Sequence, residues 1–247
     1  MKTSLILPAY NLTEELESLC RRFIESIYYT EGEGELEFIV IDNGSPFGGS
    51  MMQEQSTIYI RNYKNQGYCK AVNQGMKLAT GDLIVVANND IRVSPNWLVV
   101  AKEILESDSK IGSVHFKMVD YEAPFNLGED IWIGGKERWC HSSFYVIRPE
   151  AIPKGQYWEG YTAGGYDDWD IWLRFRKNGW KQAYTNKAAF QHEDSSTYLA
   201  MDKIEGGRAE RDKRNRELFK ERHSDYPETL FEKEFPEQMK LPYRPFP

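Results

Sequence analysis

Several features that mark other classes of protein are scarce or missing in this sequence of 247 residues. It has only three cysteines, an odd number without CxxC spacing, so neither a disulfide framework nor a cysteine-rich metal site is expected. No stretch approaches the roughly 20 apolar residues of a membrane-spanning helix. Positive charge is also in deficit: 31 basic against 38 acidic residues give a net charge of −7, which argues against nucleic-acid binding through a basic surface.

These absences favour a cytoplasmic protein, with peripheral contact to a membrane surface as an option. The segment 1–11 superficially resembles a signal peptide, but its apolar run is too short and is ended by Pro8, Asn11 and Glu14. Without disulfides or a membrane span, a reducing compartment is the simplest expectation. The length is sufficient for one sizeable α/β core and a small appendage.

The first half of the chain alternates buried strands with amphipathic helices, the pattern of a mostly parallel sheet. Strands are expected at the apolar runs 3–7, 37–42, 57–62 and 83–87. A capping box of Asn11 and Glu14 predicts the start of the first helix, and Ser94-Pro95 predicts another start after the fourth strand. The predicted fold class is α/β, with a Rossmann-like central sheet flanked by helices.

The second half is less regular. Strands are expected within 113–119, 142–147 and 188–193, and a short helix from Asp167 to about Asn178. We expect one domain over residues 1–200, followed by an appendage over 201–247. The helix Lys203–Arg222 carries eight basic and five acidic residues. A solvated face or an oligomer contact is favoured there over contact with an anionic membrane or acidic acceptor.

Polar clusters follow three of the four predicted strands, over residues 8–11, 42–45 and 88–90. Turn and cap chemistry accounts for each cluster taken alone, because Asn, Asp, Gly and Ser are common in turns. Ligands of parallel α/β sheets bind beyond the carboxyl ends of the strands, however, and three clusters on one edge favour a nucleotide-type pocket.

The order of five segments resembles the successive motifs of family 2 glycosyltransferases. They read LPAYN, VIDNGS, NQGYCKAVNQG, ATGDLIVVANND and YDDWDIWLRFRKNGW, and the resemblance covers about residues 3–195. It implies the GT-A fold and an inverting enzyme that moves a sugar from a nucleoside diphosphate, most often UDP, to a hydroxyl group. It also implies a nucleotide-sugar half over about residues 1–110 of the domain and an acceptor half over about 111–200. The acceptor is expected to be a glycan, a lipid-linked molecule or another hydroxyl compound.

The resemblance also implies a divalent cation, Mn²⁺ or Mg²⁺, held by an Asp-x-Asp motif after the fourth strand. Here the motif reads Asn88-Asn89-Asp90, so the first carboxylate is missing. Asp90 is then the expected ligand, and Asn88 and Asn89 can hydrogen-bond to sugar hydroxyls. His192 is the expected second ligand, although ordinary packing would explain a lone histidine. Its imidazole leans toward Mn²⁺.

The acidic segment YDDWD supplies the expected catalytic carboxylate. Asp168 corresponds to the general base of the family, and Asp167 is the second choice. Inverting transfer needs one carboxylate to take the proton of the acceptor hydroxyl, while the departing diphosphate, neutralised by a metal, needs no general acid. One of the two aspartates can equally serve as a helix cap.

Residues near the first three strand ends are expected to hold the nucleotide. They are Pro8, Ala9, Tyr10, Asn11, Asp42, Asn43, Asn65 and Lys70. Of these, Lys70 is able to face the diphosphate. Helix capping for Asn65 and simple exposure for Lys70 are equally good explanations of those two positions.

Other functions fit less well. A sugar-nucleotide pyrophosphorylase would have a GxGxRL-type segment after the first strand, which LPAYNLTEEL lacks. A degenerate glycosyltransferase acting as a nucleotide-sugar or glycan binding module is the main alternative, with Asn88 as its argument. The Gln-x-x-Arg-Trp motif of processive synthases is also incomplete, since Gly135 precedes Arg138-Trp139 where glutamine is required. We therefore expect transfer of a single sugar.

Overall fold

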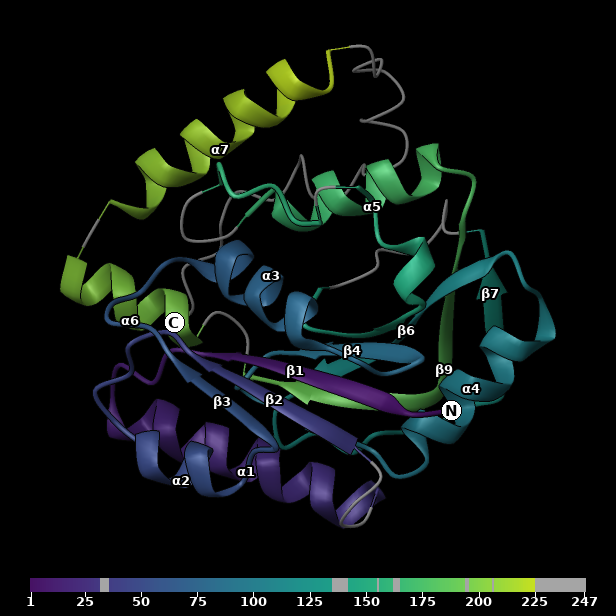
Figure 1. The fold of residues 1–247 in the computed structure, drawn as a ribbon, viewed down its shortest axis with the longest axis horizontal. Helices are drawn as coiled ribbons and strands as arrows, with labels where there is room; N and C mark the ends of the chain where they lie inside the picture. The colour runs from purple at the N-terminus through teal and green to yellow at the C-terminus, as the bar shows by residue number, and fades with distance from the viewer. Residues whose placement is uncertain are drawn as a thin grey trace.

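A computed structural model describes residues 1–31, 36–134, 142–154, 156–161, 165–193, 196–205 and 207–224. Within these residues the chain forms one nine-stranded sheet with helices on both faces (Figure 1). The strands are β1 (Thr3–Ala9), β2 (Leu36–Asp42), β3 (Ile58–Arg61), β4 (Leu83–Ala87), β5 (Ile91–Val93), β6 (Ile111–Asp120), β7 (Ile131–Ile133), β8 (Phe144–Ile147) and β9 (Lys181–His192). The helices are α1 (Glu14–Glu31), α2 (Gly49–Glu54), α3 (Tyr68–Leu78), α4 (Trp97–Ser107), the 3₁₀ turn η1 (Pro149–Ala151), α5 (Asp167–Lys177), α6 (Ser196–Glu205) and α7 (Arg208–Arg222).

The strand order is β3-β2-β1-β4-β8-β6-β9-β5, and β7 pairs with β9. β1 to β4 are mutually parallel where they pair. β8 is antiparallel to both β4 and β6, and β6 is parallel to β9. β4, β6 and β9 therefore run in the same direction, so the end of β9 lies at the same edge of the sheet as the ends of β1, β2 and β4.

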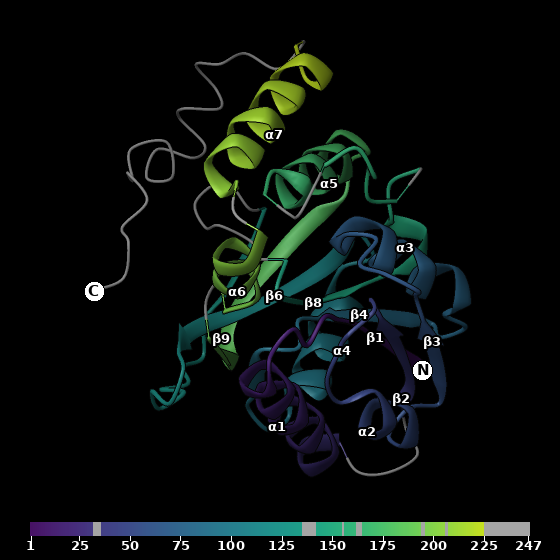
Figure 2. The ribbon, with the colours of Figure 1, turned by 90° about the vertical axis from the view of Figure 1, so that its left-hand side faces the viewer.

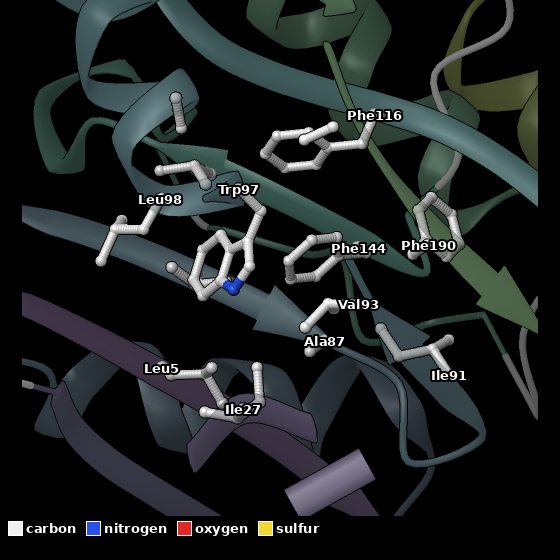
Figure 3. Close-up of a cluster of buried hydrophobic side chains, with 14 of the residues drawn as sticks. Leu5, Ile27, Ala87, Ile91, Val93, Trp97, Leu98, Phe116, Phe144 and Phe190 are labelled. Carbon is white, nitrogen blue, oxygen red and sulfur yellow. The ribbon is translucent and has the colours of Figure 1, made fainter. Parts of the chain in front are cut away.

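Alternate residues of the central strands enter two different cores. Leu5 and Leu7 of β1 pack with α1 and α4, whereas Ile6 packs with α3 and α5. This is the period of two expected of a strand covered on both faces. Figure 3 shows the first core, where Trp97 meets Phe144 with ring centroids 5.0 Å apart. The predicted α/β sheet flanked by helices is confirmed.

The predicted start of α1 was wrong in its detail. Asn11 and Glu14 do not form a capping box, because the Asn11 side chain is buried and accepts a hydrogen bond from Asn89. Thr13 caps the helix instead: its Oγ1 accepts a hydrogen bond from the Leu16 amide over 3.3 Å. The local pattern predicted Asn11 as the helix cap, but its side chain hydrogen-bonds instead to Asn89, which is distant in the sequence.

The start of α4 differs in the same way. Ser94 Oγ accepts a hydrogen bond from the Ala189 amide over 2.9 Å, so it joins β9 rather than capping the helix. Asn96, at φ 62°, is the N-cap residue, and the helix begins at Trp97. Asparagine tolerates this left-handed conformation better than most residues.

Several elements were missed or were longer than expected. β5 and β7 were not predicted, since three-residue strands carry too little periodicity, and β9 begins seven residues before the predicted strand at 188. The single predicted helix Lys203–Arg222 is two helices, α6 and α7, and α7 begins after Gly207 at φ 78°. Among the described helices, none is both long and apolar enough to cross a membrane.

Candidate active site

The three polar clusters meet at one edge of the sheet, as their positions after the strands predicted. Asn89 Nδ2 donates a hydrogen bond to Asn11 Oδ1 over 2.8 Å, which joins the loops after β4 and β1. The Asn11 amide donates to Ser45 Oγ over 2.9 Å, which joins the loop after β2. All three residues are buried. The side chains of Asn11 and Asn89 therefore hold the loops together and offer little surface to a nucleotide or sugar.

Asp42 is occupied within the protein. Its Oδ1 accepts a hydrogen bond from the Ser45 amide over 2.7 Å. Its Oδ2 accepts from the Tyr59 hydroxyl over 2.6 Å and from the Arg61 guanidinium. The side chain has no exposed surface, so the nucleotide contact predicted for it is not available in this structure. A buried carboxylate requires donors, and β3 presents two of them on one face because Tyr59 and Arg61 are two residues apart.

Asn43 organises the loop between β3 and α3. Its Oδ1 accepts hydrogen bonds from Asn62 Nδ2 over 3.0 Å and from the Gln66 amide over 2.9 Å. Its Nδ2 donates to Asn65 Oδ1 over 2.7 Å and to the Gly67 carbonyl over 3.3 Å. The two donors and two acceptor sites of the amide are thus all used. Asn43 and Asn65 shape the loop, and Asn43 has no spare group for a nucleotide.

The other residues predicted to hold the nucleotide differ in exposure. Pro8 and Ala9 end β1 and are buried, so they offer a ligand only their backbone. Tyr10 and Asn88 are half-buried at the edge of the sheet, and Lys70 is exposed near the start of α3. Tyr10, Asn88 and Lys70 are therefore the predicted residues whose side chains remain accessible.

Asp90 and His192, 102 positions apart in the sequence (192 − 90), come together. The distance from Asp90 Oδ1 to His192 Nε2 is 3.2 Å. The antiparallel pairing of β5 with β9 sets this contact, because Ile91 lies opposite His192. Both side chains are more than nine-tenths buried, at 4% and 9% exposure. The two predicted ligands therefore converge at the carboxyl edge of the sheet.

The chemistry of this pair fits a divalent cation. A carboxylate oxygen and an imidazole nitrogen are both good ligands for Mn²⁺, and the spacing of 3.2 Å suits neighbouring ligands of an octahedral ion with bonds of about 2.1 Å. No group of three or more His, Cys, Asp or Glu side chains that could hold a metal occurs in the described part of the chain. Asp90 and His192 would thus hold the ion together with oxygens from a ligand, such as the two phosphates of a nucleoside diphosphate.

Asp167 and Asp168 begin α5 at the same edge. α5 ends only four residues before β9 starts, and β9 runs toward the carboxyl edge, so the first turn of α5 lies at that edge. Asp167 is 6% exposed, whereas Asp168 is half-buried and accepts a hydrogen bond from the Trp169 amide over 2.9 Å. Asp168 is therefore the more accessible carboxylate of the pair.

The two carboxylates have raised proton affinity. Burial is the largest influence on Asp167 and raises its pKa, against hydrogen bonds from backbone amides that include Gly165. Burial and the neighbouring charge of Asp167 raise the pKa of Asp168. No lysine or arginine among the described residues forms an ion pair with either carboxylate. A carboxylate whose pKa approaches neutrality is suited to accept a proton.

Asp170, one turn into the same helix, is in the opposite situation. Its carboxylate is fully buried and accepts hydrogen bonds from Arg174 Nε over 2.7 Å, Arg222 Nε over 3.0 Å and His223 Nε2 over 2.7 Å. Burial alone would raise the pKa of Asp170, but these donors outweigh it, and the pKa lies below its ordinary value. Asp170 is therefore an anchor that ties α5 to α7.

A bridge that sequence reasoning missed joins the Asn88 loop to α5. The Ser143 carbonyl accepts a hydrogen bond from the Asn88 amide over 2.8 Å. Ser142 accepts two more: its carbonyl from the Tyr68 hydroxyl and its Oγ from Trp172 Nε1, each over 3.1 Å. The segment read only as the start of an apolar strand, so nothing in its composition signalled this role. Arg138 and Trp139 lie outside the described residues.

Comparison with known proteins agrees with this architecture. The model of the family described as "Glycosyl transferase family 2" matches residues 4–149, more than half of the chain. The chain belongs to glycosyl transferase family 2. Asp168 and His192 lie beyond the matched residues, so their place at the edge of the sheet comes from the structure.

Similar proteins extend the comparison. Dolichol-phosphate mannosyltransferase of Pyrococcus furiosus is 35% identical over an alignment of 127 residues that covers 47% of this chain and 34% of that protein. This family member thus spans about a third of that relative's length. Two solved structures share its fold. They are TarS 1–349 of S. aureus (TM-score 0.61, 16% identity, 93% of this chain and 73% of that one) and the mannosyltransferase PcManGT of Pyrobaculum calidifontis with GDP-Man and Mn²⁺ (TM-score 0.59, 17% identity, 76% and 56%). They confirm the predicted GT-A fold.

Proposed function

We propose that this family 2 protein is an inverting, non-processive glycosyltransferase that moves one sugar from a nucleoside-diphosphate donor to a hydroxyl acceptor. The observation that carries the proposal is the meeting of Asp90 and His192 at 3.2 Å, at the sheet edge where α5 presents Asp168. The Asp90–His192 pair suits a metal-bound diphosphate, and the Asp168 carboxylate suits removal of a proton from the acceptor.

Asp168 acts as the general base in this proposal. Its carboxylate takes the proton of the acceptor hydroxyl as that oxygen forms a bond to the anomeric carbon, while the bond from that carbon to the diphosphate oxygen breaks. A cation bound at Asp90 and His192 supplies charge neutralisation for the departing diphosphate. Attack from the face opposite the leaving group inverts the anomeric configuration.

Mn²⁺ is the proposed cation, with Mg²⁺ as the alternative, and a UDP-sugar is the first donor to test. Support for Mn²⁺ comes from the imidazole ligand and from PcManGT, whose structure contains Mn²⁺. That structure contains GDP-Man, so GDP-sugars belong in the same test, together with dTDP-sugars. Lipid-linked hydroxyl compounds are the first acceptor class to examine, because the name of the Pyrococcus furiosus relative includes a lipid, dolichol.

The experiment is a panel of UDP-, GDP- and dTDP-sugars, each with and without Mn²⁺, followed by thermal shift and by release of the nucleoside diphosphate. We expect one nucleotide class to raise Tm in the presence of Mn²⁺. When an acceptor is present, the sugar of that donor should be transferred with inverted configuration and the nucleoside diphosphate released. Transfer with retained anomeric configuration would overturn the proposal. So would release of the nucleoside diphosphate at the same rate with Mn²⁺ and with a chelator in its place. Binding without turnover for every donor and acceptor would instead support the binding-module alternative.

A further inference from the structure

α7 lies against α5 in both ribbon views (Figures 1 and 2). Its buried contacts repeat at intervals of four residues: Asn215 is 0% exposed, Phe219 is 4% exposed, and His223, just after the helix, is 6% exposed. This spacing puts the three side chains on one stripe of the helix. Most of the remaining residues of α7 are charged and exposed. The helix is therefore held in place mainly by this stripe.

The C-terminal end of the stripe, at His223, is part of a buried charge cluster. Asp170 Oδ1 accepts hydrogen bonds from both His223 Nε2 and Arg222 Nε. The Arg222 guanidinium also lies over the Trp158 ring, 4.2 Å from its centroid. A fully buried carboxylate needs partners with good geometry, so these contacts fix the position of α7 relative to the first turns of α5.

The rest of the stripe, Asn215 and Phe219, contacts the residues just before Asp167 and Asp168. Asn215 Nδ2 donates a hydrogen bond to the Gly165 carbonyl over 3.2 Å. Phe219 packs against Tyr166, with ring centroids 5.8 Å apart, and against Trp169 at 6.1 Å. These contacts lie on both sides of the Asp167-Asp168 pair in the sequence.

Tyr166 shows why such support is needed. It is the N-cap residue of α5 and has φ 69°, a left-handed conformation that costs a non-glycine residue about 1–2 kcal/mol. The Tyr166 carbonyl nevertheless accepts the hydrogen bond of the Asp170 amide over 3.0 Å that starts the helix. A strained residue persists only where surrounding contacts determine its conformation, and here Phe219 and Asn215 supply them.

We propose that α7 is a positioning element for the catalytic base: Asn215, Phe219 and His223 hold the first turn of α5 so that Asp168 faces the acceptor. The proposal rests on the function proposed above. It makes the helix, which lies outside the residues matched by the family model, a working part of the active site and not an appendage. Its residues act through Asp168 and do not touch the substrate.

The test compares His223→Leu, which removes the bond to Asp170, with His223→Gln, whose amide can replace Nε2 as donor. Lys213→Ala, on the exposed face of the same helix, is the matched control. We expect His223→Leu to lower kcat for transfer about tenfold or more, since a shift of about 1 Å can cost up to about 100-fold in rate. Its donor KM should stay within about twofold, because the donor contacts lie elsewhere. His223→Gln should restore most of kcat, and Lys213→Ala should match the wild type.

Hydrogen–deuterium exchange of residues 165–172 in the same variants gives a readout that does not depend on turnover. Faster exchange there in His223→Leu, with unchanged exchange in β1 and β4, is the expected result. Wild-type exchange in that segment, a wild-type kcat, or an equal loss in donor affinity would each overturn the positioning role. Failure of the proposed function would show separately, as absence of transfer by the wild-type protein or full transfer by Asp168→Asn.

Discussion

Asp168 and Asp170, two residues apart on α5, have pKa values shifted in opposite directions by their surroundings. Asp170 is fully buried and bonded to three cationic or imidazole donors, which keep its pKa low. Asp168 is half-buried, and burial together with the charge of Asp167 raises its pKa. A satisfied carboxylate contributes to structure, whereas one held at a cost to stability is a candidate for chemistry.

The same contrast separates the two polar regions along the sheet edge. Asp42 and Asn43 are saturated by hydrogen bonds from within the protein and fix the loops after β2 and β3. Asp90 and His192 instead place two metal-binding atoms beside each other. The first region is a scaffold, and the second is where we propose that the donor's diphosphate is held.

The largest expected effect is that of Asp168→Asn. We expect transfer to fall about 100-fold or more while donor Kd changes little, because the amide keeps the shape but cannot take a proton. Tm should stay the same or rise, since a half-buried charge beside Asp167 is removed. Rates of nucleoside diphosphate release and a thermal melt measure the two quantities. Asp170→Asn is the contrasting variant, and it should lower Tm. A lower Tm for Asp168→Asn with an unchanged Tm for Asp170→Asn would contradict the different roles assigned to the two carboxylates.

The next effect concerns the cation. His192→Ala should raise the Mn²⁺ concentration needed for half-maximal transfer by about tenfold or more, as one of two protein ligands is lost. Titration of activity with Mn²⁺ in metal-depleted buffer measures this. The exposed cation Lys77, in the last turn of α3, serves as control, and Lys77→Ala should keep the wild-type Mn²⁺ requirement. An unchanged requirement in His192→Ala would remove the histidine from the site.

Transfer should also depend on pH. The raised pKa of Asp168 means that its carboxylate is protonated, and inactive as a base, over a range in which an ordinary aspartate is already ionised. The rate should therefore fall about tenfold per pH unit below that pKa, and the fall should begin well above pH 4. A pH profile of kcat at saturating donor and Mn²⁺ measures it. A rate that stays flat down to about pH 4 contradicts the assignment.

The smallest effect on rate is expected from Asp42→Asn, which tests the scaffold side of the comparison. Loss of the charge paired with Arg61 should lower the free energy of unfolding by about 2–3 kcal/mol, less than for a fully buried pair because Arg61 is half exposed. Transfer measured well below Tm should change less than about threefold. Urea unfolding and the transfer assay separate the two quantities, and lost donor binding without lost stability would return Asp42 to the nucleotide site.

Much of this arrangement was readable from the sequence. Buried strands with polar ends predicted the sheet and the meeting of the loops that carry Asn11, Ser45 and Asn89, because parallel strands end at one edge. Resemblance to the family singled out Asp90, His192 and Asp168 before their positions were known. The residues involved are close to strand ends or to a helix start, where local pattern is informative.

The details that were missed depend on contacts distant in the sequence. Asn11 and Ser94 were expected to cap helices, yet each hydrogen-bonds to a residue more than 75 positions away. Asp42 and Asn43 were expected to contact the nucleotide, but in this structure their oxygens accept hydrogen bonds from β3 and the loop that follows it. The docking of α7 through Asn215 and His223 had no signal either, because the helix has almost no apolar stripe. The domain boundary near residue 200 and the appendage over 201–247 stay predictions, and residues 225–247 lie outside the described part of the chain. An oligomer contact through the C-terminal helix also stays a prediction.

The most direct measurement is the position of Mn²⁺ in crystals grown with a nucleoside diphosphate, located by its anomalous scattering. We expect one strong peak within bonding distance of Asp90 Oδ1 and His192 Nε2, with phosphate oxygens completing the coordination and the Asp168 carboxylate facing the open side of the donor site. A Mn²⁺–diphosphate complex bound at Asp42 and Asn43, or away from Asp90 and His192 altogether, would contradict it.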